Sequence, residues 1–121
     1  MELSLYDKIG AEKIRKLIHD FYLGIRKDEL LKPMYQEDFE GAEERLFLFI
    51  TQYLGGPDTY NQQRGHPRLR QRHVVFPITE QAKQHWLKNM EHALDVSDIA
   101  DIEKELLWKY FQQTAEFLKN R

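Results

Sequence analysis

Apolar residues repeat along most of the chain with the period of an α-helix. Between Ile14 and Ile25 they recur at intervals of three and four residues, which places them on one face of a helix. Ser4 and Asp7, three residues apart, are typical of a helix start, so a short helix should precede this one. Gly10 should separate the two helices. The start of the chain is therefore predicted to be helical.

Three further helices are predicted downstream. The first runs from about residue 40 to residue 54, and the Gly-Gly-Pro sequence directly after it should end it, since proline cannot continue a helix. The second starts after Thr79, which suits an N-cap, and the third starts near Ser97. Their expected buried stripes are, in order, Ala42, Leu46, Phe49, Ile50 and Tyr53; Ala82, Trp86, Met90, Ala93 and Leu94; and Ile99, Ile102, Leu106, Tyr110, Thr114 and Phe117.

Two stretches do not fit the helical period. Residues 58–65 are polar, and their low hydrophobic content predicts a long loop rather than a core element. The apolar residues 74–76 could form a short strand, which Pro77 would cut short. The predicted fold class is therefore all-α, with a single domain over residues 1–121 built from about four long helices.

The composition narrows the class of protein. The chain has 121 residues, with 18 Lys and Arg against 20 Asp and Glu, so its net charge of −2 excludes a globally basic nucleic-acid coat. The absence of cysteine excludes disulfides, thiolate zinc sites, iron–sulfur clusters and a cysteine nucleophile. No apolar run could span a membrane, and the first residues do not resemble a signal peptide. We therefore expect a cytoplasmic protein with no membrane partner.

The charge pattern changes in the middle of the chain. Residues 59–79 contain no acidic residue, whereas charges of both signs alternate elsewhere. The basic residues of this segment are Arg64, His66, Arg68, Arg70, Arg72 and His73. Such a cluster attracts phosphate, carboxylate or nucleic acid. A solvated basic turn without a ligand is the alternative, and the charge pattern alone leaves both open.

His73 lies at the boundary between this basic segment and the apolar residues 74–76. An axial haem ligand needs a neutral imidazole that faces an apolar slot, and the two haem propionates need cations at the rim of the pocket. A histidine that follows arginines and precedes large apolar residues meets both needs. A structural or merely exposed histidine is the alternative. The other histidines do not form a zinc-binding spacing: His19, His66, His85 and His92.

Several stretches of the sequence occur in an order that resembles a known family. They are FYLGI at residues 21–25, GAEERL at 41–46, QYLGGPDTY at 52–60, GHPRLRQRHVVFPI at 65–78 and HWLKNM at 85–90. Together they resemble the group II truncated haemoglobins over nearly the whole chain. The resemblance implies a truncated globin fold, a two-over-two α-helical sandwich that encloses haem b (iron protoporphyrin IX). The sequence departs from the family pattern at Gly10, which is followed by Ala11 rather than by a second glycine.

The resemblance also implies roles for individual residues. It makes His73 the proximal ligand of the iron and Arg72 a partner of a haem propionate, to which Tyr60 adds a hydrogen bond. Three hydrogen-bond donors are placed on the distal side: Tyr22, Tyr35 and Trp86. Small or apolar residues complete the expected pocket: Ala42 at the distal gate, Leu46, Phe49, Ile50, Phe76, Ile78 and Met90. Tyr35 stands where other members carry phenylalanine, and so adds a phenol donor.

The implied function is binding of oxygen and of other diatomics such as nitric oxide and carbon monoxide, with oxygen transport included. Distal hydrogen bonds of about 1–3 kcal/mol each predict slow release of oxygen. Nitric oxide dioxygenation or peroxide chemistry is the alternative, and it needs an electron donor that the sequence does not identify. A haem-free helical module that binds nucleic acid through residues 64–72 is a remote second alternative. The leading interpretation is a monomer or homodimer that binds no nucleic acid.

Overall fold

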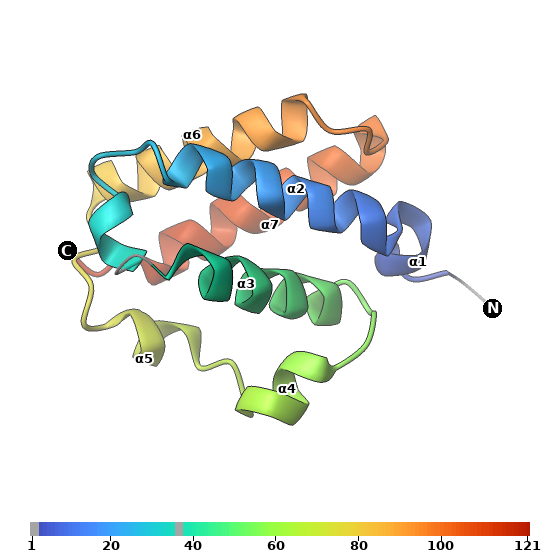
Figure 1. The fold of residues 1–121 in the computed structure, drawn as a ribbon, viewed down its shortest axis with the longest axis horizontal. Helices are drawn as coiled ribbons and strands as arrows, with labels where there is room; N and C mark the ends of the chain where they lie inside the picture. The colour runs from blue at the N-terminus through green and yellow to red at the C-terminus, as the bar shows by residue number, and fades with distance from the viewer. Residues whose placement is uncertain (1–2, 36–37) are drawn as a thin grey trace.

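The computed structural model describes residues 3–35 and 38–121, and every regular element in these ranges is helical (Figure 1). The elements are α1 (Leu5–Ile9), α2 (Ala11–Ile25), the 3₁₀ helix η1 (Lys32–Tyr35), α3 (Phe39–Tyr53), α4 (Thr59–Arg64), α5 (Leu69–His73), α6 (Glu80–Asp95) and α7 (Asp101–Leu118). Within the described residues, no helix combines the length and the apolar character that crossing a membrane requires.

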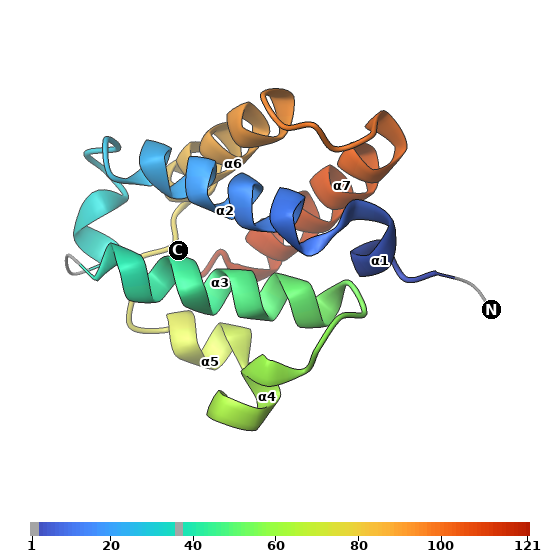
Figure 2. The same cartoon turned by 45° about the vertical axis from the view of Figure 1, so that its right-hand side comes forward.

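The long helices form two pairs that cross each other (Figures 1 and 2). Helix α2 packs against α3, α6 packs against α7, and α2 also packs against α6, so the pairs are joined face to face. The short helices α4 and α5 lie on the side of α3 that faces away from α2. The predicted all-α class is confirmed, and the two pairs form the expected two-over-two sandwich.

Short polar side chains set the starts of three helices. The Ser4 hydroxyl and the Thr79 hydroxyl each accept a hydrogen bond from the backbone N–H three residues on, both at 3.0 Å. Asp38 does the same at the start of α3, at 3.1 Å. Each bond satisfies an N–H group that the helix itself leaves unpaired. Gly10 separates α1 from α2 with φ of +93°, a left-handed conformation that favours glycine. The predicted caps and this helix break are confirmed.

The core lies between the two pairs of long helices. Helix α2 contributes the predicted face, whose residues are almost fully buried. The largest fully buried side chains are Phe21, Phe111, Ile14, Leu17, Ile18, Ile25, Ile50, Met90 and Leu107. Burying a side chain of this size stabilises the fold by roughly 1.5–3 kcal/mol, which holds the four long helices in place.

The prediction of a loop over residues 58–65 is wrong, because Thr59–Arg64 forms α4. This helix is held by contacts with α3 rather than by an apolar stripe of its own. Tyr60 is buried and packs edge-on against Phe49, with ring centroids 5.6 Å apart. The Gln52 side chain accepts from the Asn61 backbone N–H at 3.0 Å and donates to the Asn61 side chain at 3.1 Å. An isolated helix of six residues is only marginally stable, so the sequence of this segment gives little indication that it is helical.

The predicted buried stripe of the last helix is wrong in part, although its first residue, Ile99, is buried. Ile102, Leu106 and Phe117 are 75%, 46% and 53% exposed. The buried face of α7 consists instead of Leu107, Phe111 and Ala115. Apolar residues stand next to each other along this helix, so its sequence presents two candidate stripes one position apart, and packing against α6 selects the second. Tyr53 at the end of α3 is likewise 53% exposed, and it stacks on Tyr110 with centroids 3.9 Å apart.

Two smaller expectations also fail. Helix α7 begins at Asp101 rather than near Ser97, because the Ser97 hydroxyl donates to the Leu94 carbonyl at 2.7 Å and so closes α6 instead. Residues 74–76 form a turn and not a strand. The Phe76 N–H donates to the His73 carbonyl at 3.0 Å, which bends the chain directly after α5.

Candidate functional site: a cavity between the helix pairs

A cavity of about 560 Å³ lies inside the described part of the molecule. Its size is within the range of ligand pockets, roughly 300–1,000 Å³. The predicted site residues that line it are Tyr22, Tyr35, Ala42, Leu46, Phe49, Ile50, Tyr60, Arg72, His73, Phe76, Ile78 and Trp86. Met90 does not line it, and is instead fully buried in the core. The chain therefore folds distant sequence segments around a shared space.

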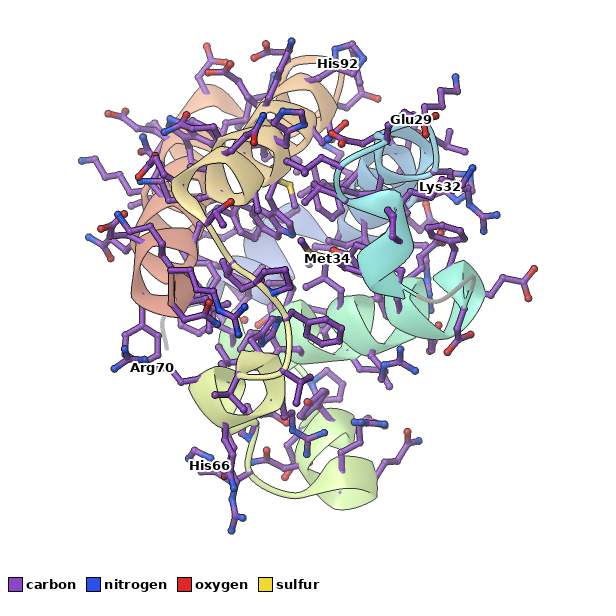
Figure 3. All side chains as sticks on the ribbon, turned by 90° about the vertical axis from the view of Figure 1, so that its left-hand side faces the viewer. Glu29, Lys32, Met34, His66, Arg70 and His92 are labelled. Atoms are coloured by element: carbon purple, nitrogen blue, oxygen red, sulfur yellow. The ribbon has the colours of Figure 1, made fainter. Side chains whose placement is uncertain are left out.

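Residues outside the predicted site complete the wall. Helix α7 contributes Tyr110 and Thr114 from the predicted stripe, and Phe111, Ala115 and Leu118 from the stripe beside it. Leu31 and Met34 close the wall near η1. Figure 3 shows the labelled residues of this segment: Met34 lies on its inner side, whereas Glu29 and Lys32 project outward. The sequence signal for Phe111, Ala115 and Leu118 is the second apolar stripe of α7.

His73 is the last residue of α5, and its imidazole has a defined orientation. Its Nδ1 lies 2.7 Å from the carbonyl oxygen of Leu69, one turn earlier. A carbonyl oxygen only accepts hydrogen bonds, so Nδ1 must carry the proton. In the neutral ring, the lone pair is then on Nε2. The arrangement provides a metal-binding nitrogen whose ring is held by a second bond to the backbone, as in many metal sites.

Arginines stand at the rim of the cavity beside His73. The Arg72 guanidinium donates to the Arg64 carbonyl at 3.1 Å, and lies 5.9 Å from the centre of the Tyr60 ring. The Arg64 guanidinium lies 6.0 Å from the same ring. Arg45 also lines the cavity, where it pairs with Asp38 at 3.4 Å. The rim is thus cationic where the interior is apolar, which suits a flat apolar ligand with carboxylates at one edge.

Aromatic donors gather at another part of the wall. The rings of Tyr22 and Tyr35 meet edge to face, with centroids 5.5 Å apart and an interplanar angle of 88°. Trp86 of α6 packs on Phe21 with centroids 4.8 Å apart. Two phenols and one indole from α2, η1 and α6 therefore surround the same corner of the cavity.

The phenols of this corner hold their protons strongly. Burial raises the pKa of Tyr22 well above its usual value of 10, and the neighbouring Tyr35 raises it further. Burial also raises the pKa of Tyr35 to about 12, although hydrogen bonding with Trp86 and Tyr22 lowers it in part. Both side chains are therefore neutral hydrogen-bond donors over the whole physiological range of pH.

A polar cluster supports this corner from behind. The Asp28 carboxylate accepts hydrogen bonds from the backbone N–H groups of Leu30 and Leu31, at 3.0 and 3.1 Å. It also accepts from the Asn89 side chain at 3.0 Å and lies 3.1 Å from His85 Nδ1. The cluster ties the turn before η1 to the residues around Trp86 on α6. Sequence analysis did not identify it, because its members are 57 and 61 residues apart along the chain.

Comparison with known proteins decides the family. The family model described as bacterial-like globin matches residues 4–120. The chain belongs to the bacterial-like globin family. This globin is 36% identical over 116 residues to group 2 truncated hemoglobin YjbI of Bacillus subtilis, and the alignment covers 96% of this chain and 88% of the relative. It is 39% identical over 123 residues to two-on-two hemoglobin-3 of Arabidopsis thaliana, covering 97% and 69%.

Solved globin structures share the fold of this chain. The hemoglobin of Chloroflexus aurantiacus superposes with a TM-score of 0.96 at 36% identity, covering 99% of this globin and 100% of that chain. The hemoglobin of Thermobifida fusca gives a TM-score of 0.94 at 40% identity, with 98% of each chain covered. The resemblance to the group 2 truncated haemoglobins and the truncated globin fold are both confirmed.

The cavity fits the haem b that globins bind. Its interior is apolar, its rim carries arginines, and a histidine with a free-lone-pair nitrogen lines it. A globin haem site combines these three features: an apolar slot for the macrocycle, cations for the propionates and a neutral imidazole for the iron. This globin is therefore a haem protein.

Proposed function

We propose that His73 holds the haem iron through Nε2, and that Tyr22, Tyr35 and Trp86 hydrogen-bond the bound diatomic ligand. The observation that carries the proposal is the 2.7 Å contact between His73 Nδ1 and the Leu69 carbonyl, since it leaves Nε2 as the lone-pair nitrogen of a residue in the cavity wall. When bound, haem b supplies an iron atom that takes oxygen and other diatomics reversibly. The function is therefore oxygen binding.

The chain's own groups fix the cofactor and set its properties. Donation from His73 Nδ1 to a backbone carbonyl fixes the tautomer and makes the ring a stronger ligand. Arg72 and the buried Tyr60 both line the cavity, and we expect them to bind the propionates. Phe49, Ile50 and Phe76 line the slot and exclude water from it. A dry site strengthens each hydrogen bond that the distal donors make.

The distal residues control how long a ligand stays. A hydrogen bond contributes about 1–3 kcal/mol in a dry pocket, the upper end applying to a charged partner, and about 1.4 kcal/mol changes a rate tenfold. Three donors at one corner therefore predict tight binding and slow release. Ala42, at the expected gate, is 7% exposed and too small to donate or to close a path. We expect ligands larger than oxygen to enter as well.

Four further predictions belong to this proposal. They are a role in oxygen transport, a cytoplasmic location, an electron donor that restores the ferrous state, and a monomeric or homodimeric protein. Slow release of oxygen favours oxygen storage or redox chemistry over oxygen transport between nearby sites. Nitric oxide oxidation or peroxide chemistry would add the requirement for the electron donor.

Replacing His73 by Ala tests the proposal. We expect the purified wild-type protein to show the visible absorption bands of haem, and the His73→Ala variant to lose haem at least tenfold faster to an excess of apomyoglobin, because a coordinate bond is lost. His66→Ala is the matched control, since His66 is exposed on the same segment (Figure 3). If His66→Ala loses haem and His73→Ala keeps it, the ligand is assigned wrongly.

A further inference from the structure

An exposed patch of mixed chemistry lies on the outer side of α5. We call it the α5 patch and define it by His66, Arg68, Arg70, Val74, Val75 and Phe117. Val74, Val75 and Phe117 are 60%, 76% and 53% exposed. None of the six residues lines the haem cavity. Figure 3 shows Arg70 of α5 and His66, in the bend between α4 and α5, projecting outward. The patch is therefore a surface distinct from the cationic rim.

The charge of the patch is positive and unbalanced. Among the described residues, neither Arg68 nor Arg70 forms a salt bridge. Glu116, which precedes Phe117, is already neutralised by Lys83 at 2.7 Å and by Lys119 at 3.4 Å. The patch thus presents free positive charge on a chain whose net charge is −2. Such a local field attracts negatively charged partners and steers their approach.

The patch is also held in a fixed shape. The Arg70 guanidinium lies 4.9 Å from the centre of the Phe117 ring, which joins α5 to the end of α7. The Asn120 side chain donates to the His73 carbonyl at 3.3 Å and to the Phe76 carbonyl at 3.1 Å, which anchors both ends of the turn that carries the valines. A surface that is ordered before binding loses less entropy when a partner docks.

The combination indicates a protein partner. Exposed apolar side chains surrounded by charges are typical of protein interfaces, whereas a site for phosphate or nucleic acid needs no exposed valines. A second copy of this chain is disfavoured, because two α5 patches placed face to face would bring like charges together. The partner should therefore present an acidic surface with an apolar centre.

The position of the patch indicates what the partner does. Val74 directly follows His73 in the chain, so the patch adjoins the residue proposed to hold the iron. We propose that the α5 patch docks an acidic one-electron donor protein of the ferredoxin type. This inference rests on the proposed function. One electron passes from the reduced iron–sulfur cluster of the donor to ferric haem, giving oxidised donor and ferrous haem, and no bond forms or breaks.

The test uses the holoprotein and plant-type ferredoxin, an acidic one-electron carrier. Binding of oxidised ferredoxin is measured by isothermal titration calorimetry, and reduction of the ferric holoprotein by reduced ferredoxin is measured by stopped flow. The Arg68→Gln/Arg70→Gln variant should weaken binding and slow reduction about tenfold at low ionic strength. Raising the salt concentration should lower the ferredoxin affinity and the reduction rate of the wild type toward those of the variant, because salt screens exposed charges.

A matched variant separates this effect from a general loss of charge. Lys88→Gln/Lys109→Gln removes the same charge from exposed positions on α6 and α7, and should change binding by less than about twofold. Equal effects of the two double variants would overturn the proposal. Val75→Asp should weaken binding as much as the arginine variant, and unchanged binding would also contradict the proposed centre of the interface.

Two controls keep the remaining outcomes distinct. Photoreduced lumiflavin, a neutral small reductant, should reduce wild type and the arginine variant at the same rate, and a slower variant would place the defect in the cavity and overturn docking. Binding of a fluorescent duplex oligonucleotide is measured for the wild type and for the arginine variant. If the oligonucleotide binds only the wild type, and ferredoxin binds neither protein, the patch is a nucleic-acid site instead. A purified protein without haem bands would instead refute the proposed function.

Discussion

At the scale of single residues, the site depends on which atoms carry protons. The Leu69 carbonyl fixes the proton of His73 on Nδ1, and burial keeps Tyr22 and Tyr35 protonated. The sequence predicted all three as site residues, because His73 and Tyr22 stand in stretches that the family shares and Tyr35 stands where other members carry phenylalanine. It did not identify the Leu69 contact or the shifted pKa values, since both depend on how the folded chain surrounds these groups.

Replacing Tyr22 by Phe removes one of the proposed distal donors and keeps the ring. We expect oxygen to leave the ferrous Tyr22→Phe protein about tenfold faster, because a hydrogen bond worth about 1–2 kcal/mol is lost. Stopped-flow displacement of oxygen by carbon monoxide measures the rate. Tyr53→Phe is the control, since Tyr53 is exposed and lies outside the cavity wall. Equal rates in the two variants would remove Tyr22 from the ligand-binding role.

The raised pKa of Tyr35 predicts a loss of stability in alkaline solution. The unfolded phenol ionises near its usual pKa of 10, whereas the folded one ionises near 12. Between pH 10 and pH 12 the unfolded chain binds fewer protons than the folded chain. The stabilisation associated with the neutral Tyr35 phenol is therefore complete below pH 10 and is lost as the pH rises toward 12. The difference in free energy of unfolding between wild type and Tyr35→Phe should therefore shrink over this range. Urea titrations at stepped pH measure it, and a constant difference would contradict the raised pKa.

At the scale of elements, the strength of local signals determined what could be predicted. Helix α2 has a regular apolar stripe and the cap of α6 is a threonine, so both were predictable. Helix α4 is too short to have a stripe, and it exists because Tyr60 and Asn61 bind α3. On α7 two apolar stripes compete, and only contact with α6 decides between them.

Asp28 joins the turn before η1 to α6 through its hydrogen bonds, which we call the Asp28 joint. Removing the carboxylate should show how much this joint contributes to the free energy of unfolding. Burial alone would raise the pKa of Asp28, but hydrogen bonds from His85, Leu31 and Asn89 outweigh it and lower the pKa. Asp28→Ala should reduce the free energy of unfolding by about 1–3 kcal/mol, because it leaves buried N–H groups without an acceptor. Urea unfolding of the holoprotein measures this loss.

A control variant and the pH dependence of stability distinguish the effect of losing Asp28 from that of losing an ordinary surface charge. Asp20 pairs with Lys16 at 2.7 Å within one exposed helix turn, so Asp20→Ala should cost less than about 0.5 kcal/mol. The lowered pKa stabilises the fold above the usual value of 3.8, and this contribution is lost as the pH falls below it. An Asp28→Ala variant as stable as Asp20→Ala at neutral pH would show that the joint does not hold the elements together.

At the scale of the whole molecule, the fold is built around a space that the chain alone does not fill. Two crossed pairs of helices enclose the cavity, and α5 presents His73 to it from the side away from α2 (Figure 2). A ligand that binds only the folded state stabilises that state in proportion to its affinity. The haem therefore acts as part of the core, which explains how so short a globin encloses a cavity of about 560 Å³.

The bond between His73 and the iron is the central claim, and resonance Raman spectroscopy of the ferrous, ligand-free protein tests it most directly. The wild type should show an iron–imidazole stretching band. The His73→Gly variant, reconstituted with haem, should lack the band, and added free imidazole should restore it by occupying the vacated space. An unchanged band in His73→Gly without imidazole would show that another residue holds the iron.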